Sequence, residues 1–598
     1  MHVMVQEQEV RTLARKYALQ NAVQHGGKAN PGAVVGRIMG GAPEYRAASK
    51  EVMPIIHSEV GVVNAMDAVA QKAELEALDP SLLEKKKRER GHPFKTLPRF
   101  EEHDTIVMRF APNPNGPATL GHSRGMVTMS EYKRIAEQAG KKGVLVLRFD
   151  DTDPQVKPPY PPAYKWIEED YGWLGEKPDR VVAASSRNEE YYKVAEALIE
   201  KGAAYVCSCP KEKAKEYRDA GKPCPHRERP TGEDKADWAR MVAGEMAEGA
   251  ATLRIKTEVA HKDPAQRDWV GFRIVKTPHP VVGDKYNVWP MLDFESAVED
   301  HLQGVTHIIR GKDLQDSTRR QKYLYQHMGW TYPETLYWGR VQIDEVGKFS
   351  SSGMRRDIEA GKYSGWDDPR LPTLRALRRR GIKAEALRAF WVGMGLSEKD
   401  VAASLMNLYA ESAKILEPTA DRYFFVNDPV EVRLEVPDPE VGELVAKSLV
   451  HPDRPERGVR TNRLSVAGGV GRVILSRRDL LELDAGDLVR LKDLGNVRVR
   501  SLELDDPVVV WEGTELDAAR KARAAVVEWL PAAEEATCPM VVLRPEPDES
   551  PEGLRHRGRV ERAVLEAEPG SVVQFERYGY CRLERVDGGE VLAVYAHR

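Results

Sequence analysis

The 598-residue chain has few cysteines, no long apolar run and almost no net charge. Its five cysteines, three of them between residues 207 and 224, are too few for a disulfide framework and favour a reduced compartment with one candidate metal site. No apolar stretch approaches the roughly 20 residues that span a bilayer, and the N-terminus lacks a secretory pattern. We therefore expect a cytoplasmic protein with no membrane partner.

The 90 basic and 93 acidic residues give a net charge of -3, which excludes a uniformly basic coat for nucleic acid but permits local basic faces. Charged residues make up 31% of the chain, against a typical value of about 25%. The excess fits a hot or salty source as well as RNA-facing helices, and composition does not separate these. The length alone predicts about three to five domains.

The pattern of apolar residues changes several times along the chain. Residues 1–100 predict a helical extension ending in a basic run, EKKKRER, which is either solvated or grips RNA. From residue 103, strands such as TIVMRF, GVLVLRF and THIIRG alternate with helices and predict a parallel α/β core in two halves, 101–202 and 276–340. Residues 203–275 interrupt it as an inserted subdomain, 341–415 predict a Ser-rich loop with helices, and 416–598 predict one or two β-barrels.

The stretch RFAPNPNGPATLGHSRG, residues 109–125, predicts a turn between a buried strand and a helix. Such a turn presents unpaired N–H groups and a helix N-terminus at the carboxyl edge of the sheet, where phosphates bind. Gly121 lets a ligand approach the backbone, and His122 can donate to a phosphate oxygen. A histidine that only caps or packs is the alternative.

A second loop, VGKFSSSGMRR at residues 346–356, is rich in N–H and hydroxyl donors and carries Lys348, Arg355 and Arg356. This composition suits a mobile clamp on a triphosphate, and equally a flexible linker.

Three charged residues follow or end predicted parallel strands: Arg109, Asp150 and Arg310. The carboxyl ends of parallel strands deliver side chains to a ligand crevice, so these charges either bind a charged ligand or pair with one another across the sheet ends.

The cysteine cluster offers two short ligand pairs, and Cys207, Cys209, Cys224 and His226 could complete a tetrahedral Zn²⁺ shell. One-residue spacers are tighter than the common two-residue spacers, and reduced, unligated cysteines are the alternative. Cys538 and Cys581 lie in β-rich sequence, where we expect them to be packing residues.

Six motifs in order, RFAPNPNG, TLGH, LRFDDTDP, THIIRGKD, KFSSS and GWDDPRLPTLRALRRRG, resemble those of class I glutamyl-tRNA synthetases of the archaeal type. The resemblance extends over essentially the whole chain, including DRYFFV, LKDLGNVRV and VVQFERYGYCRL. It implies a Rossmann-type catalytic core, an inserted acceptor-stem-binding subdomain with a zinc site in related enzymes, a helical connecting domain and a C-terminal anticodon-binding double barrel.

The resemblance also implies an activity. L-Glutamate and ATP, with Mg²⁺, would give glutamyl-adenylate, and the 2′-hydroxyl of the terminal adenosine of tRNA(Glu) would take the acyl group. The related enzymes need bound tRNA before they activate glutamate. We expect a monomer, and whether tRNA(Gln) is also charged, which requires a tRNA-dependent amidotransferase as partner, stays open.

In the resemblance, TLGH stands for the HIGH signature and KFSSS for KMSKS, with Thr119 and Ser351 in place of a histidine and a lysine. We hypothesise that Lys348, Arg355 or Arg356 neutralises the departing pyrophosphate, and that the Thr119 hydroxyl gives a weaker phosphate hydrogen bond. The ATP contacts implied by the resemblance are Pro112, Asn113, Gly121, His122, Lys348, Ser350 and Ser352.

For glutamate, the resemblance places Arg109 and Arg310 on the two carboxylates and Asp150 on the ammonium group. Leu292 stands where relatives often carry a pocket tyrosine, and we expect Trp289 to wall the site instead. Basic residues expected to face tRNA, or else solvent, are the 85–90 run, Arg375, Arg378, Arg379, Arg380, Arg498 and Arg500, the last two opposite Val497 and Val499 on one strand.

Two rival functions remain. A glutaminyl-tRNA synthetase shares the core and barrels, but RFAPNPNG and two arginines for two carboxylates favour glutamate. A non-catalytic, synthetase-derived tRNA-binding protein is made credible by Thr119 and Ser351.

Overall fold

The computed structural model describes residues 6–42, 45, 48–82, 94–345, 350–503, 505–545, 554–586 and 589–598. The chain divides into two compact units, Met1–His92 and Pro93–Arg598. The basic run at 85–90, expected either to be solvated or to grip RNA, and Lys348, expected to contact ATP, lie outside the described residues. Within the described ranges, no helix combines the length and apolarity that crossing a membrane requires.

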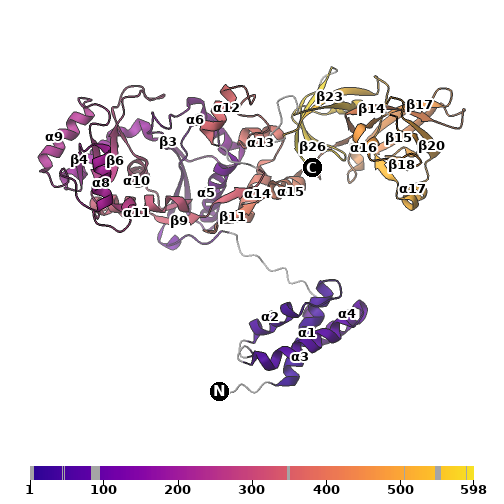
Figure 1. The fold of residues 1–598 in the computed structure, drawn as a ribbon, viewed down its shortest axis with the longest axis horizontal. Coiled ribbons are helices and arrows are strands. Elements are labelled where there is room, and N and C mark those ends of the chain that lie inside the picture. Colours follow the sequence, from indigo (N-terminus) through magenta and orange to yellow (C-terminus); the bar gives the residue numbers. More distant parts are fainter. Residues whose placement is uncertain are drawn as a thin grey trace. The chain divides into compact units, whose positions relative to one another are not determined.

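The described residues of the first unit form four α-helices, α1 (Glu7–Gln24), α2 (Pro31–Gly41), α3 (Ser49–Asn64) and α4 (Ala68–Leu78) (Figure 1). Val10, Ala14 and Ala18 recur every fourth residue on α1, so they share one face, and that face is fully buried. Helix α2 begins at Pro31 because Asn30 caps it by accepting a hydrogen bond from the Ala33 N–H.

The second unit is organised around a five-stranded sheet whose strands are all parallel, in the order β3-β2-β1-β8-β9. Alternate residues face opposite sides: Ile106 and Met108 belong to the cluster under α5 (Leu120–Gln138), whereas Val107 packs with Val144 and Ile308 on the other side. The strands are β1 (Thr105–Phe110), β2 (Lys142–Phe149), β3 (Arg180–Ala183), β8 (His307–Gly311) and β9 (Glu334–Trp338). The predicted parallel core is confirmed.

Between α7 (Asn188–Glu200) and β8 the chain forms a four-stranded antiparallel sheet with helices α8 (Lys211–Ala220) and α9 (Thr231–Val242) beside its first strands. The strands are β4 (Ala204–Cys207), β5 (Thr252–Ile255), β6 (Trp269–Ile274) and β7 (Val288–Pro290). The last strand lies beyond residue 275. Helix α10 (Leu292–Leu302) then returns the chain to the parallel sheet.

Further helices and short strands connect and follow the parallel strands. Helix α6 (Pro161–Trp173) links β2 and β3, and α11 (Gln315–Met328) links β8 and β9. After β9 come β10 (Val341–Ile343), α12 (Ser351–Glu359), α13 (Leu374–Arg380), α14 (Ala384–Met394), β11 (Val401–Ala403) and α15 (Leu405–Leu416).

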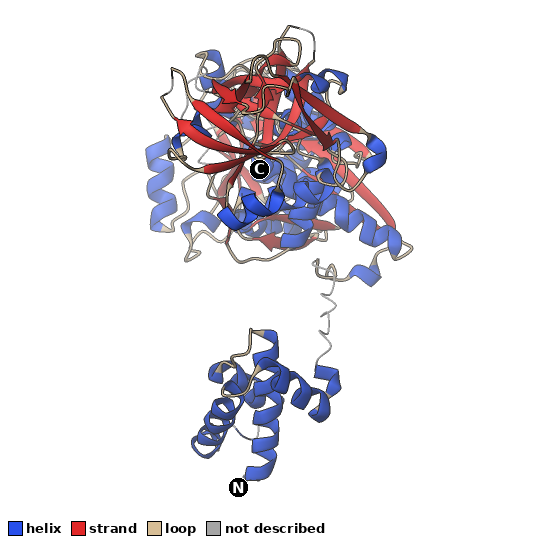
Figure 2. Ribbon diagram, turned by 90° about the vertical axis from the view of Figure 1, so that its right-hand side faces the viewer, coloured by secondary structure: helices blue, strands red, loops and turns tan. Residues whose placement is uncertain are grey.

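The chain after residue 420 is rich in strands, as the sequence predicts (Figure 2). One seven-stranded sheet contains β12 (Arg422–Tyr423), β25 (Val572–Phe575), β26 (Gly579–Arg585), β27 (Val591–His597), β23 (Thr537–Leu543), β24 (Arg555–Glu561) and β13 (Phe425–Asn427). The other contains β21 (Ala525–Val527), β18 (Leu488–Leu491), β19 (Gly495–Ser501), β20 (Val508–Gly513), β14 (Pro429–Glu435), β17 (Val470–Ser476) and β22 (Leu530–Pro531).

The remaining elements of this part are the hairpin of β15 (Glu443–Leu449) and β16 (Val459–Ser465) and the short helices α16 (Arg477–Leu481) and α17 (Leu516–Ala522). On β19 the predicted alternation is confirmed: Val497 and Val499 are buried, whereas Arg498 and Arg500 are exposed. Arg498 pairs with Glu512 on the adjacent strand β20, and Arg500 pairs with Glu435 on β14, the strand beyond β20.

A buried ionic cluster joins the hairpin to the sheet that contains β24. Arg460 on β16 pairs with Glu561 on β24 and donates to Glu576 at 2.6 Å, and Asn462 also donates to Glu561. Arg460 and Glu561 are 4% and 1% exposed, and burial raises the pKa of Glu561 although Arg460 opposes the rise.

We predict that Arg460→Met lowers the free energy of unfolding by about 3–5 kcal/mol at neutral pH, because it leaves Glu561 buried without its cation. This loss of stability should shrink as the pH falls toward about 4.3, the ordinary pKa of glutamate. A carboxyl whose pKa is raised by folding destabilises the folded state only at pH values at which that carboxyl is ionised in the unfolded chain. Urea denaturation at pH 8 and pH 5 measures this. The matched variant is Arg463→Met, whose exposed partner is Glu443; equal losses in both would contradict the cluster's role.

Candidate active site

A cavity of about 380 Å³ opens at the carboxyl end of the parallel sheet. Its lining includes Arg109 from β1, Asp150 just after β2 and Arg310 from β8, so three of the residues predicted to bind an amino acid lie together. The cavity sits where β1 separates β2 from β8, the point at which the strand order reverses and where α/β sheets bind ligands.

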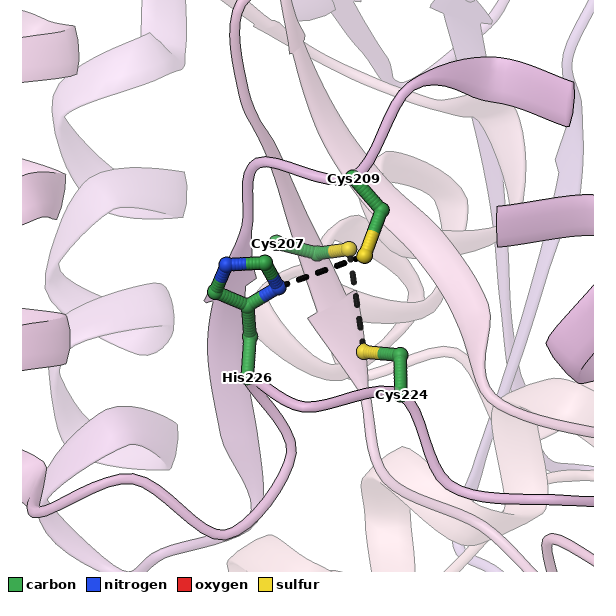
Figure 3. A group of neighbouring side chains, drawn as sticks. All are labelled: Cys207, Cys209, Cys224 and His226. Carbon is green, nitrogen blue, oxygen red and sulfur yellow. Dashed lines mark hydrogen bonds between the residues drawn. The ribbon is translucent and has the colours of Figure 1, made fainter. Parts of the chain in front are cut away.

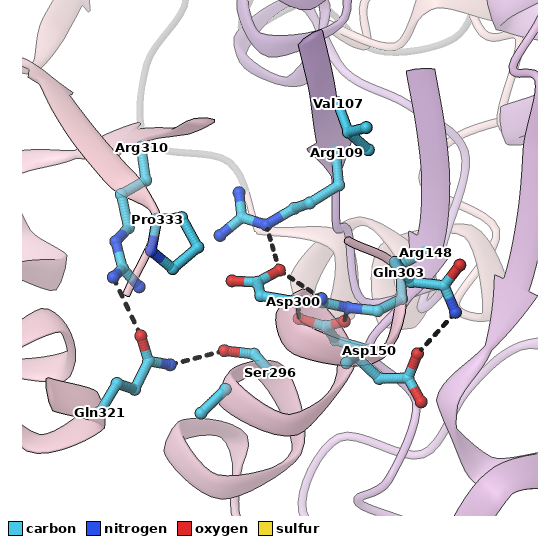
Figure 4. Close-up of polar contacts among 12 residues, drawn as sticks. Val107, Arg109, Arg148, Asp150, Ser296, Asp300, Gln303, Arg310, Gln321 and Pro333 are labelled. Carbon is cyan, nitrogen blue, oxygen red and sulfur yellow. Dashed lines mark hydrogen bonds and ion pairs between the residues drawn. The ribbon is translucent and has the colours of Figure 1, made fainter. Parts of the chain in front are cut away.

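A chain of alternating charges lies beneath this cavity (Figure 4). The Arg109 guanidinium lies 3.0 Å from Asp300, Arg148 lies 2.7 Å from the same Asp300 oxygen, and Arg148 lies 2.6 Å from Asp150. The four side chains are each less than a tenth exposed. Arg109 and Asp150 therefore take part in ion pairs, which was the alternative to ligand binding, and both residues also line the cavity.

Sequence reasoning missed Arg148 and Asp300. Arg148 interrupts β2, a strand whose other residues from 143 to 149 are apolar or glycine and buried. A charged residue in such a strand is the available sign of a buried partner, because an isolated buried charge is too costly to keep.

Burial and the neighbouring charges together shift the pKa values of the carboxyl groups in and beside this chain of ion pairs. Burial raises the pKa of Asp150, and Arg148 opposes the rise. Burial also acts on Asp300, but Arg109 and Arg148 outweigh it and lower the pKa of that carboxyl. Glu295 on α10 lies 3.4 Å from Arg148, and burial together with Asp150 raises its pKa well above the usual range. Asp300 is therefore the ionised carboxylate that Arg109 and Arg148 share.

Arg310 differs from the other two arginines because its partners are neutral. Its Nη2 donates to Thr318 at 2.7 Å, to Gln321 at 3.0 Å and to Tyr332 at 2.6 Å. Its buried Nε has no hydrogen-bond partner, and no carboxylate of the described residues lies within 4.0 Å of it. A guanidinium that is 6% exposed and faces a cavity without a counter-charge suits an anionic ligand.

The expectation for Trp289 is wrong. Its side chain is 1% exposed, stacks on His279 with ring centroids 5.1 Å apart, and is not among the described residues that line the cavity. The β7 strand turns this indole toward the inserted sheet, whereas Met291 and Leu292, which follow β7, form the wall.

The turn at Thr119–His122, which carries the TLGH motif, is held by hydrogen bonds between its own residues. Thr119 caps α5 by accepting from the His122 N–H at 3.3 Å, and the Thr119 N–H donates to His122 Nδ1 at 3.2 Å. Burial lowers the pKa of His122, so the imidazole is neutral at pH 7. An added Cβ at Gly121 would meet nothing nearer than 3.7 Å, so packing does not demand glycine and the space above this residue is open.

Two further predicted ATP contacts lie between this turn and the cavity. Asn113 donates from Nδ2 to the carbonyl of Asp150 at 3.0 Å and lines the cavity, while the Pro112 carbonyl accepts from the Asp150 N–H at 3.1 Å. The loop after β1 and the loop after β2 are thus tied together.

The start of α12, at Ser351 of the KFSSS motif, lies against the loop after β1, at Gly116. An added Cβ on Gly116 would stand 3.4 Å from the Cβ of Ser351 and 3.0 Å from the Trp366 ring. Ser350 caps α12 by accepting from the Gly353 N–H at 3.1 Å, and Ser352 is exposed on its first turn. The two loops therefore converge, which is the arrangement expected if both contact one ATP molecule.

The basic residues beside this loop differ in their contacts. Arg355 lies over the Tyr160 ring at 4.8 Å and pairs with Glu359 at 2.8 Å. Arg356 is exposed, and no carboxylate partner for it occurs in the described part of the chain. Lys348 lies outside the described residues.

The four predicted metal ligands form one group (Figure 3). One ligand atom of each of Cys207, Cys209, Cys224 and His226 lies within 4.8 Å of every other. The Cys207 and Cys224 sulfurs are 3.8 Å apart, which matches the edge of a tetrahedron with Zn–S bonds of about 2.3 Å. His226 presents Nδ1 to Cys209 at 3.3 Å, while its Nε2 bonds the Ser208 hydroxyl at 2.9 Å.

The arginines predicted to contact tRNA lie at the end of α13. Arg379 pairs with Glu584 at 2.7 Å, and Arg380, 7% exposed, donates to Tyr409 and to the Ala596 carbonyl. These contacts join α13 to the strand-rich part. Arg378 is the exposed member of the three, and RNA contact stays a prediction.

Comparison with known proteins defines the class. The family model of the catalytic domain of class I tRNA synthetases (E and Q) matches residues 105–417, and two models of the anticodon-binding domain of the same family match residues 420–516 and 526–584. The chain belongs to the class I tRNA synthetase family for E and Q.

Similar individual proteins of this family are named glutamate–tRNA ligases. A glutamate–tRNA ligase of Methanothrix thermoacetophila is 46% identical over 99% of this chain and 100% of its own length. The glutamate–tRNA ligase of Methanosarcina mazei is 47% identical over 98% of both chains, and that of Pyrococcus abyssi is 44% identical over 99% of this chain and all of its own.

Arg148 has charged partners and Arg310 has neutral ones, and this difference predicts different effects of their substitution on stability. Arg148→Met should lower the free energy of unfolding by about 3–5 kcal/mol, because it strands buried carboxylates, whereas Arg310→Met should change it by less than about 1 kcal/mol, because only neutral partners are lost. Urea denaturation followed by tryptophan fluorescence compares the two. A larger loss for Arg310→Met would contradict the assignment of partners.

Proposed function

We propose that this protein is a glutamate–tRNA ligase that forms glutamyl-adenylate from L-glutamate and ATP and transfers the acyl group to tRNA(Glu). The observation that carries this is the unneutralised, buried guanidinium of Arg310 in a cavity beside the Thr119–His122 turn. The relatives named glutamate–tRNA ligase, similar over nearly the whole chain, support the same assignment.

The charges of the cavity suit the amino acid. Glutamate has two carboxylates and one ammonium group, and the cavity wall presents Arg109, Arg310 and Asp150. Asp300 and Asp150 balance Arg109 and Arg148, so the excess positive charge is that of Arg310, and a ligand with a net charge of about -1 offsets it. The neutral side-chain amide of glutamine leaves one guanidinium without a partner, and we expect glutamate to be preferred.

ATP would lie across the two converging loops. Pro112, Asn113, Gly121 and His122 contribute from the first loop, and Lys348, Ser350, Ser351 and Ser352 from the second. Mg²⁺ enters with the nucleotide as a counter-ion to its phosphates, and no residue is assigned to it. Arg356, exposed and without a described acidic partner, is placed to neutralise the departing pyrophosphate, whereas Arg355 is held by Glu359.

Catalysis on this proposal comes from alignment and charge stabilisation. The glutamate α-carboxylate attacks the α-phosphate, pyrophosphate leaves, and the terminal ribose 2′-hydroxyl then attacks the activated carbonyl and releases AMP. No side-chain nucleophile is needed in this sequence of steps.

The remaining parts would serve the RNA. We assign 1–100 to a helical extension, 101–202 and 276–340 to the Rossmann-type halves, 203–275 to acceptor-stem binding, 341–415 to the connecting domain, and 416–598 to two anticodon-binding barrels. Arg378, Arg379, Arg380, Arg498 and Arg500 are RNA candidates. We place the enzyme in the cytoplasm as a monomer, and use of tRNA(Gln), with an amidotransferase as partner, is the open alternative in substrate choice.

Zinc is part of the proposal. Cys207, Cys209, Cys224 and His226 fit a tetrahedral structural ion in number, type and spacing. The Ser208 hydroxyl bonds His226 Nε2 at 2.9 Å and so orients the ring, as residues behind the ligands of metal sites do.

Charging assays test the function. Purified protein should esterify tRNA(Glu) with glutamate and should leave both tRNA(Glu) and tRNA(Gln) uncharged with glutamine. Arg310→Gln should raise the KM for glutamate about 10- to 100-fold, the loss expected for a charged hydrogen bond, because a carboxylate loses its guanidinium. Arg319→Gln, an exposed neighbour on α11, is the control and should keep the wild-type KM.

The outcomes separate the rivals. Charging with glutamine identifies a glutaminyl enzyme, and tRNA binding without adenylate formation identifies the non-catalytic alternative.

Elemental analysis tests the metal site. Protein purified without chelator should carry one zinc per chain, and Cys209→Ser should lower both the zinc content and the melting temperature, because structural zinc adds folding free energy. Cys538→Ala, at a buried cysteine outside the cluster, should keep its zinc. A stoichiometry near zero in the wild type would reject the site.

A further inference from the structure

Four consecutive residues after β2, residues 150–153, form a loop that we call the DDTD loop. Its first residue, Asp150, lines the cavity and is the candidate ligand of the glutamate ammonium group. The loop after β1 holds the backbone of this residue: the Asp150 N–H donates to the Pro112 carbonyl at 3.1 Å, and the Asp150 carbonyl accepts from Asn113 at 3.0 Å. The next three residues of the loop make different contacts.

The Asp151 side chain ties the DDTD loop to the parallel core. Its carboxylate accepts from the N–H and from the hydroxyl of Ser185, both at 2.7 Å, and from the Tyr164 hydroxyl. Ser185 follows β3, and Tyr164 lies on α6. Because Asp151 and Ser185 are both fully buried, water does not compete for these bonds, and the loop is anchored firmly on this side.

The inserted subdomain holds the same loop from the other side, through His279. This residue lies between β6 and β7, and its Nε2 is 2.7 Å from the Asp151 carbonyl oxygen. A carbonyl oxygen only accepts, so Nε2 carries the proton and donates it, while Nδ1 accepts from the Val281 and Val282 N–H groups at 3.1 and 3.3 Å. The ring is 2% exposed and stacks on Trp289, so its orientation is fixed as well.

Two further contacts join the DDTD loop to strands of the inserted sheet. Asp153 pairs with Arg273 on β6 at 2.7 Å, and the Thr152 hydroxyl donates to the carbonyl of Pro290, at the end of β7, over a longer 3.4 Å. Each of the last three residues of the loop thus contacts the inserted subdomain. The position of Asp150 therefore depends on where that subdomain lies, because every residue that follows it in the loop is bonded there.

We propose that His279 and Arg273 are positioning residues that place the Asp150 carboxylate for the ammonium group of glutamate, so that the inserted subdomain sets the affinity of the amino acid site. This inference rests on the function proposed above, since it takes glutamate as the ligand. Arg273 also lines the cavity, whereas His279 is not among the described residues that line it and acts through the DDTD loop. His279 is therefore the sharper probe.

Substitutions at His279 separate the hydrogen bond from the shape of the ring. His279→Gln keeps a side-chain N–H that can replace the one on Nε2, whereas His279→Phe keeps the ring and its stacking on Trp289 but has no donor. Arg273→Met removes the pair with Asp153 and tests the loop by an independent route. Arg240→Met is the control, because Arg240 is exposed and its acidic partners belong to the same subdomain.

Pyrophosphate exchange with tRNA(Glu) present gives the KM for glutamate in the full-length protein. We expect His279→Phe and Arg273→Met to raise this KM about 10-fold with kcat unchanged, because a displaced carboxylate binds the ammonium group less well. His279→Gln and Arg240→Met should keep the wild-type KM. In an Asp150→Asn background, His279→Phe should raise the KM no further, because its effect passes through Asp150.

Glutarate separates this effect from a general loss of structure. It has both carboxylates of glutamate and no ammonium group, so a misplaced Asp150 leaves its binding unchanged, whereas a disordered cavity weakens it. The inhibition constant of glutarate against glutamate should therefore be the same in the wild type and in His279→Phe.

The outcomes are distinguishable. The proposal is overturned, and the proposed function stands, if His279→Phe leaves the KM for glutamate unchanged, weakens glutarate by the same factor, or adds to the effect of Asp150→Asn. If His279→Phe does not fold by circular dichroism, Arg273→Met decides by the same measurements. A wild-type protein that gives no exchange with glutamate would instead overturn the proposed function, and this inference with it.

Discussion

The buried ion chain from Arg109 through Asp300 and Arg148 to Asp150 is the constraint on which the site depends. Each charge in it has an opposite neighbour, so the chain can stay out of water, and its two ends are held rigidly on the cavity wall. Arg310 stands outside this chain with neutral partners. The cavity therefore carries one positive charge without a counter-charge, and on the proposed function this charge would favour a ligand that brings a carboxylate to Arg310.

The same sheet edge also organises the phosphate side. The loop after β1 is tied to the loop after β2 through Asn113 and Pro112, and the turn at Ala118–Leu120 is tied to the start of α13 through Leu374 and Pro372. On the proposed function, amino acid and nucleotide would bind to loops that share hydrogen bonds. Catalysis by alignment needs the reacting groups held in a fixed geometry, and these shared hydrogen bonds would help to hold them.

Much of this could be predicted from the sequence. Apolar strands that end in Arg109 and Arg310, and the ordered motifs, located the cavity and the two converging loops. Long-range pairs were beyond reach: Asp300 lies 191 residues from Arg109, and nothing local marks it as a partner. Trp289 was misplaced because an aromatic near a predicted site gives no direction; the register of β7 turns it away. The capping box formed by Thr119 and His122 could not be predicted, because it shows only when both hydrogen bonds are seen, and the phosphate contact of Thr119 stays a prediction.

The most direct test of this account is a crystal structure with a non-hydrolysable glutamyl-adenylate analogue. The account predicts that the side-chain carboxylate and the acyl group of the analogue each lie within hydrogen-bond distance of a different guanidinium, Arg109 or Arg310, with the amino group at Asp150 and the phosphate-like group at His122 Nε2. An analogue bound elsewhere, or one whose side-chain carboxylate meets neither arginine while Arg310 keeps its neutral partners, would contradict it.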